Sequence, residues 1–178
     1  MKAITELDSQ WGRQFAVFIE EVREAWKTTE GEATAEKVKR AMERLFQQSS
    51  LSEPWVIALR DEKQTVELYR DEEFGFIQMG HYHNVGHASP PHDHGNHWVV
   101  YGIYKGDIEI ATYDLQPTSE TLKVTERHHL TDGDANVYVP GEIHSTRQLS
   151  PEGSVVLRFL SADLKKVKRS HYNWEQVE

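Results

Sequence analysis

The chain has 178 residues and a formal net charge of −9, with 38% hydrophobic and 28% charged residues. This is the composition of one globular domain, which takes roughly 100–200 residues. The acidic balance argues against nucleic-acid or anionic-membrane partners, which require a basic face, and no apolar run approaches the ~20 residues of a membrane span. The N-terminal residues lack the apolar stretch of a secretory signal, and there is no cysteine, so we expect a cytoplasmic protein without disulfides or thiolate ligands.

The first fifty residues are expected to be helical. Apolar side chains recur there at offsets of three and four residues, in two stretches separated by TTEGEAT. The residues are Trp11, Phe15, Phe18, Ile19, Val22 and Trp26, then Val38, Met42, Leu45 and Phe46. We expect residues 1–50 to pack on residues 51–178 as one domain overall. The same apolar helices would alternatively cover a second copy of the chain, which makes a homo-oligomer a candidate assembly.

From Pro54 onward the sequence has the character of a β-protein. Short segments rich in β-branched and aromatic residues alternate with turn residues at intervals close to the ~8–12 residues of sandwiches and barrels. The segments are WVIALR, VELYR, GFIQMGHYH, HWVVYGIY, DIEIATYD, TLKVTERHHL, NVYVP and SVVLRFL. No helical stretch between them is long enough to connect parallel strands. The sequence therefore predicts an all-β barrel or jelly roll, preceded by N-terminal α-helices.

Histidine is the residue type that carries candidate chemistry. His92 and His94 are two residues apart, so on a strand their imidazoles would project to the same side. His144 follows a strand that ends in a Pro-Gly turn and is the best candidate for a third ligand. Three neutral imidazoles hold a metal while leaving positions open for substrate or oxygen. We therefore predict a metal site formed by His92, His94 and His144.

The spacing around these histidines is similar to the two signature motifs of the cupin superfamily. The matching positions are His92, His94, Val99 and Gly106 in the first motif, and Gly133, Gly141 and His144 in the second. Pro140 lies one position later than the usual proline, and Gln148 replaces a common asparagine. The resemblance covers residues 92–148 and implies a double-stranded β-helix barrel with the metal inside it.

Within the cupins, the chain resembles the thiol dioxygenases, the cysteine and 3-mercaptopropionate dioxygenase group. This resemblance extends through the N-terminal helices, ELYRDEEFGF and SPPHDHGNHWVVYGIYKGD. The usual cupin glutamate ligand falls at Val99, which cannot bind a metal. The resemblance thus implies a mononuclear, three-histidine Fe(II) enzyme that oxidises a small anionic thiol or carboxylate with O2. Three neutral ligands leave the +2 charge uncompensated, which attracts an anionic substrate.

The chain also departs from the thiol dioxygenases. Their crosslink needs a cysteine, which is absent here, and their Ser-His-Tyr series would fall on SVVLRFL. On that segment Val156, Arg158 and Leu160 share one strand face, and Arg158 takes the position from which the family's histidine points toward the metal. The family's carboxylate-binding arginine corresponds to Arg70 in LYRDE. Arg70 and Arg158 are therefore the candidate catalytic residues, as binders of a substrate carboxylate.

Other functions and other site residues stay open at this stage. The chain would alternatively be a Zn, Ni or Mn cupin lyase, isomerase or hydrolase that does not use O2, or a small-molecule-binding cupin without catalysis. His81, His83 and His87 could form a rival metal site, and His97 a fourth ligand or a base. Glu142 is either an acid/base or a surface carboxylate. The basic run Lys165, Lys166, Lys168 and Arg169 is expected to be a solvated surface, with partner binding as the alternative.

Overall fold

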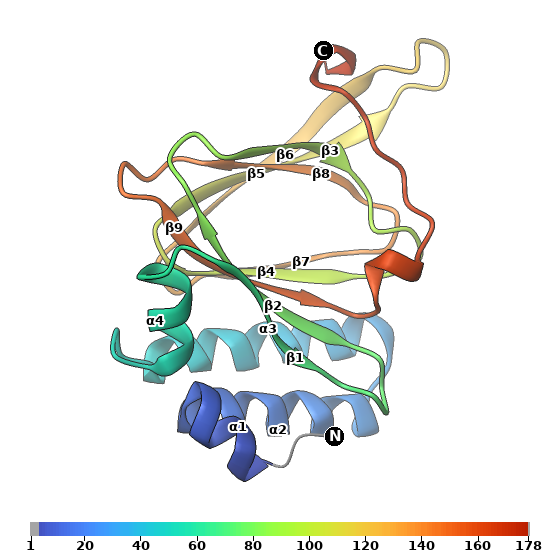
Figure 1. Cartoon of the computed structure of the whole chain (residues 1–178). Helices are drawn as coiled ribbons and strands as arrows, with labels where there is room; N and C mark the ends of the chain where they lie inside the picture. Colours follow the sequence, from blue (N-terminus) through green and yellow to red (C-terminus); the bar gives the residue numbers. More distant parts are fainter. Residues whose placement is uncertain (1–3, 178) are drawn as a thin grey trace.

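The structure is a computed structural model that describes residues 4–177 (Figure 1). Within these residues, four α-helices precede nine β-strands, and two short 3₁₀ helices follow. The α-helices are α1 (Ile4–Trp11), α2 (Arg13–Thr28), α3 (Gly31–Gln48) and α4 (Pro54–Arg60). The strands are β1 (Thr65–Arg70), β2 (Ile77–His83), β3 (Ala88–His92), β4 (Val99–Lys105), β5 (Asp107–Leu115), β6 (Leu122–Thr131), β7 (Ala135–Tyr138), β8 (Ile143–Gln148) and β9 (Ser154–Leu160). The 3₁₀ helices are η1 (Leu164–Lys166) and η2 (Trp174–Gln176).

The strands form two antiparallel sheets that face each other (Figure 1). Sheet A has the order β1-β2-β9-β4-β7, and sheet B has the order β3-β8-β5-β6. Strands β2 to β9 are distributed between the sheets in the order of a jelly roll, or double-stranded β-helix, while β1 extends sheet A at its edge. The predicted barrel is thus confirmed. The description all-β is too narrow, because helices form a third layer.

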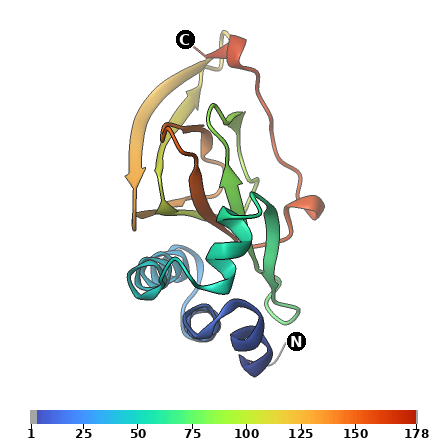
Figure 2. The same ribbon diagram turned by 60° about the vertical axis from the view of Figure 1, so that its left-hand side comes forward.

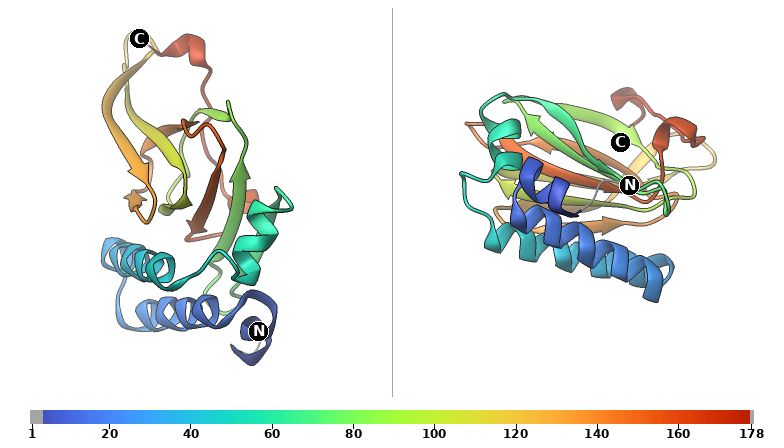
Figure 3. Two further views of the ribbon diagram at one scale, coloured as in Figure 1. Left: turned by 90° about the vertical axis from the view of Figure 1, so that its left-hand side faces the viewer. Right: turned by 60° about the horizontal axis from the view of Figure 1, so that its bottom comes forward.

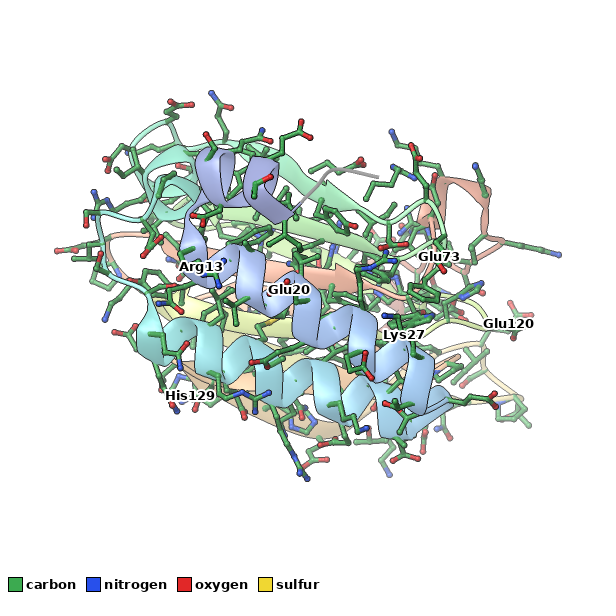
Figure 4. All side chains as sticks on the ribbon, turned by 90° about the horizontal axis from the view of Figure 1, so that it is seen from below. Arg13, Glu20, Lys27, Glu73, Glu120 and His129 are labelled. Atoms are coloured by element: carbon green, nitrogen blue, oxygen red, sulfur yellow. The ribbon has the colours of Figure 1, made fainter. Side chains whose placement is uncertain are left out.

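The predicted N-terminal helices cover the outer face of sheet A (Figures 1 and 2). Trp26 of α2 packs on Trp98 and on Phe159 of β9, with ring centroids 5.3 and 5.7 Å apart. On the opposite side of α2, Arg13, Glu20 and Lys27 face away from the sheet (Figure 4). The amphipathic pattern therefore places these helices on the chain's own barrel. No helix within residues 4–177 has the length and apolar character needed to cross a membrane.

The segment WVIALR, which was expected to be a β-segment, forms α4 instead. Pro54 occupies the first turn, where its missing N–H costs nothing and its fixed φ favours a helix. Trp55 and Leu59, four residues apart, are both buried on the side that faces the barrel. The prediction was wrong because a short apolar run carries no periodicity that separates helix from strand.

Alternation along β9 separates the two cores of the molecule. Leu157 and Phe159 join the apolar cluster between sheet A and the helices. Val156 and Leu160 belong to the cluster between the two sheets, and Arg158 lines a cavity on that same side. The predicted sharing of one strand face by these three residues is therefore confirmed.

The segment after β9, residues 161–177, runs along one side of the barrel from sheet A to sheet B (Figures 1 and 3). It forms η1 and then bridges His92 at the end of β3 through His171. It ends beside β6, where Val177 bridges Leu122. We call residues 161–177 the tail. Its path brings it against the loop that follows β3.

Candidate metal centre and cavity

The three predicted ligands come together between the sheets. His92 ends β3, and His144 lies directly opposite it in β8. His94 lies in the loop after β3, so the strand alternation considered for the pair does not apply to it, and its ring turns back toward the other two. One nitrogen from each histidine lies within 4.8 Å of the others. All three side chains are buried, His144 completely.

The rings of His92 and His144 are each held by a hydrogen bond at Nδ1. His92 Nδ1 donates to the Pro90 carbonyl at 2.9 Å, and His144 Nδ1 donates to the Glu142 carbonyl at 3.2 Å. Since a carbonyl oxygen only accepts, each of these rings carries its proton on Nδ1 and keeps the Nε2 lone pair free.

The spacing of the nitrogens suits a metal ion. His94 Nε2 and His144 Nε2 are 3.2 Å apart. Two nitrogens that each lie ~2.1 Å from one ion, at angles between octahedral and tetrahedral, are about 3.0–3.4 Å apart. Burial lowers the pKa of His94 to about 2 and of His144 to about 3, and it also lowers the pKa of His92. The rings are therefore neutral, as metal ligands must be, and the residues present fit a bound metal.

Two glycines, Gly95 and the signature-motif residue Gly141, shape the loops that hold the candidate ligands. Gly95 follows His94 with a φ of 59°, and a Cβ at this position would lie 2.4 Å from the Lys168 carbonyl oxygen of the tail. Gly141, also at positive φ, donates its N–H to the Gly95 carbonyl at 2.8 Å. The loop of His94 is thereby joined to the turn that precedes His144.

A cavity of about 200 Å³ lies between the two sheets, and one of the three candidate ligands, His92, is part of its lining. The residues that line it all carry a polar group and come from both sheets and from the loop between β2 and β3: His81, His83, His87, Ser89, His92, Tyr101, Thr146 and Arg158. None of these residues is acidic. Arg158 makes no hydrogen bond or ion pair to the described part of the chain, and its Nε is buried. The cavity therefore combines neutral imidazoles with one cation that has no protein counter-charge.

The structure separates the two predicted arginines. Arg158 lines the cavity of the histidines, whereas Arg70 lies in a different cleft, of about 560 Å³. Arg70 donates to Glu67 at 2.7 Å and to Asp163 at 2.9 Å, so its charge is already compensated. The structure does not bring Arg70 to the candidate ligands.

The residues left open by the sequence are also placed. His97 lines the cleft of Arg70, away from the cavity. Glu142 closes its own turn by accepting the Val139 N–H at 2.9 Å. His81, His83 and His87 all line the cavity, but their ligand atoms do not form a metal-binding group, and His83 stacks on His87 at 4.1 Å.

Sequence reasoning missed Tyr101, Ser89 and Thr146 as cavity residues. For Tyr101 a signal existed, because it lies two residues after Val99 and therefore on the same strand face. Its ring packs edge-on against His144 at 5.6 Å. Ser89 and Thr146 hydrogen-bond each other at 2.8 Å across β3 and β8, two strands that the sequence did not predict.

Fold and site together define a double-stranded β-helix protein with a candidate three-histidine metal centre. No family model and no curated protein matches the chain. Among solved structures, it is similar to an oxalate oxidase in complex with the substrate analogue glycolate, at 13% identity and a TM-score of 0.44, covering 55% of this chain and 46% of that one. The cupin domain of Schizosaccharomyces pombe Cnp3 aligns at 13% identity and a TM-score of 0.46, covering 57% of this chain and 62% of that one.

A double-stranded β-helix protein from Klebsiella pneumoniae aligns at 14% identity and a TM-score of 0.47, covering 64% of this chain and 88% of that one. The chain thus spans less than two thirds of the first two of these structures. All three TM-scores are below 0.5, so the assignment of the fold rests on the strand order described above.

Proposed function

We propose that the protein is a mononuclear non-haem Fe(II) dioxygenase that oxidises a small anionic thiol or carboxylate with O2. The observation that carries the proposal is the convergence of one ring nitrogen from each of three histidines, without a carboxylate ligand, beside a cavity that contains Arg158. The resemblance of the sequence to the thiol dioxygenases supplies the reaction class.

The charges of the site favour an anionic substrate. Val99 is fully buried at the position of the usual glutamate ligand and contributes no charge. Asp93, between two of the ligands, directs its Oδ1 to the backbone N–H groups of Gly95 and Ser170 and not into the cavity. A divalent ion and Arg158 would together present three positive charges, which a thiolate or carboxylate ligand offsets.

Each part of the cavity then has a role. Arg158 binds the substrate carboxylate through paired N–H donors and so fixes the end of the substrate that does not react. Tyr101, 4% exposed and packed on His144, narrows the space beside the ligands. Val156 and the rest of the apolar cluster between the sheets exclude water from the part of the barrel interior next to the cavity. A bound iron would supply the redox chemistry, while these residues orient the substrate.

The test is metal analysis of anaerobically purified protein, followed by oxygen consumption against a panel of small thiols and carboxylates. We expect bound iron and consumption with a thiol acid, lost in His144→Ala. Protein without a first-row metal, or full activity after His92→Ala, would contradict the proposal. Bound zinc with activity that persists without oxygen would instead identify a non-oxidative cupin enzyme. Ligand affinity without turnover would identify a binding protein.

A further inference from the structure

His81 and His83 are two of the cavity side chains that have no role in the function proposed above. His81 and His83 lie on β2, two residues apart and on the same face of the strand. Met79, on the same face, lies opposite Arg158 of β9, whereas His81 and His83 lie opposite Val156 and Ser154.

The register also gives the order of these groups along the cavity. Arg158 lies opposite Tyr101 of β4, and Tyr101 packs on the candidate ligand His144. Each step of two residues along a strand covers ~6.6 Å. From Arg158 back along β9, the next residues on this face are Val156 and then Ser154. Val156 lies opposite His81, and Ser154 lies opposite His83. From the metal ligands outward, the polar groups therefore follow in the order Arg158, His81, His83.

The two histidines have ring nitrogens without partners. His83 is 8% exposed, and its buried Nδ1 has no hydrogen bond in the described part of the chain. His81 contacts the Thr65 hydroxyl through Nδ1 at 3.2 Å, but its buried Nε2 is unpaired. Because buried polar atoms are nearly always hydrogen-bonded, unpaired nitrogens on two residues of the same strand face point to a polar ligand group.

We propose that His81 and His83 form a second subsite, which binds a hydroxyl group at the end of the substrate remote from the metal while Arg158 holds the carboxylate. This rests on the proposed function only in treating the cavity as the substrate pocket. The substrate is then a short hydroxylated organic acid. A cavity of about 200 Å³ has the volume of roughly seven water molecules at ~30 Å³ each, which limits the substrate to a few carbons.

The chemistry of the wall selects a hydroxyl over other groups. Burial lowers the pKa of His81 to about 2 and of His83 to about 3, so both rings are neutral, and each unpaired nitrogen is a donor or an acceptor according to the tautomer of its ring. A hydroxyl group donates and accepts, and so satisfies both kinds of nitrogen. A second carboxylate only accepts, an ammonium group would be repelled by Arg158, and a methyl end would leave the nitrogens unpaired.

The subsite is tested by calorimetric titration of the metal-free protein with butanoate and 4-hydroxybutanoate, which differ by one terminal hydroxyl. We expect 4-hydroxybutanoate to bind roughly three- to tenfold more tightly, the effect of one net hydrogen bond. His81→Phe and His83→Phe should each reduce this preference, and the double variant should abolish it. His129→Phe makes the same change at an exposed histidine outside the cavity and should retain it.

A measurement on the unmodified protein makes the test independent of how well the variants fold. Addition of 4-hydroxybutanoate should shift the imidazole nitrogen resonances of His81 and His83 and leave those of His129 in place. Equal affinity for the two probes, no binding of either, or a preference that survives the double variant would overturn the subsite. Iron and oxygen play no part in these titrations. A failed dioxygenase assay with an intact hydroxyl preference would therefore contradict the reaction class and not the subsite.

Discussion

Replacement of Asp93 by alanine is expected to weaken metal binding although Asp93 is not a candidate ligand. Its Oδ1 accepts the N–H of Gly95 at 2.9 Å and the N–H of Ser170 at 3.0 Å, and its own N–H donates to the Ser170 carbonyl at 3.1 Å. One carboxylate oxygen of Asp93 therefore binds both the loop after β3, at Gly95, and the tail, at Ser170. Without this oxygen, the segment that carries His92 and His94 keeps its backbone bond to the tail but loses both side-chain bonds that hold it.

The magnitude follows from the two lost bonds. Hydrogen bonds to a charged group contribute ~1.5–3 kcal/mol each, so ~3–6 kcal/mol is the upper limit for the pair. Part of this free energy is lost from the stability of the fold, and part is lost from the binding of the metal. Changes in the groups that orient metal ligands typically reduce metal affinity about 10- to 100-fold, equivalent to ~1.4–2.7 kcal/mol. We expect Asp93→Ala to fall in this range.

The assay is a competition titration of Zn(II) or Co(II) against a chromogenic chelator. Asp93→Asn keeps an acceptor oxygen and should stay within about threefold of the wild type. Asp132→Ala is the matched control, because the Asp132 side chain likewise accepts a backbone N–H, from Gly106 at 2.7 Å, in a turn outside the metal centre. Unchanged affinity in Asp93→Ala, or an equal loss in Asp132→Ala, would refute the reasoning.

Three further variants test other parts of the structure. Asp71→Asn should destabilise the fold by ~2–4 kcal/mol in urea unfolding at pH 7, because the fully buried carboxylate accepts from Arg23, Tyr69 and two backbone N–H groups. The pKa of Asp71 is lowered in the folded protein, so this stabilisation is full above the unfolded pKa of ~3.9 and is lost as the pH falls through the folded value. A difference between wild type and variant that persists unchanged at pH 3 would contradict the assignment. Gly95→Ala should be less stable than Gly133→Ala by more than ~1 kcal/mol, since both have positive φ but only Gly95 has a backbone atom within 3 Å of the added Cβ. Arg158→Met should raise the substrate KM about 10- to 100-fold in oxygen-consumption assays with metal content unchanged, and a lower metal content would assign Arg158 a structural role instead.

The meeting of the three histidines was predictable because short sequence motifs surround each of them. His92 and His94 are close in sequence, and the glycines around them and around His144 report turns that only certain spacings allow. The two-residue period of strands also placed Arg158 inside the barrel correctly. These inferences need no knowledge of which strands pair.

Other features depended on tertiary contacts that the sequence does not reveal. Strands β3 and β8 were missed, since ASPPH contains two prolines and IHSTRQ is mostly polar, yet both strands face the cavity. Arg70 looked equivalent to Arg158 but lies on the added edge strand β1. One of its partners, Glu67, is only three residues away, but the other, Asp163, is 93 residues away, so the sequence showed at most half of this compensation.

The charges inside the barrel bear on the proposed function in addition to the candidate ligands. A partly buried arginine without a carboxylate partner is costly, and a divalent ion held by three neutral histidines nearby would increase that cost through repulsion. An anion that contacts both Arg158 and the metal ion would reduce both electrostatic costs. Linkage then requires that metal and anion increase each other's affinity by the same factor. In a protein that only stored metal, a carboxylate in place of Val99 or Arg158 would increase the affinity for the metal ion. The residues that line the cavity include no carboxylate, and under the proposed function the substrate supplies this negative charge.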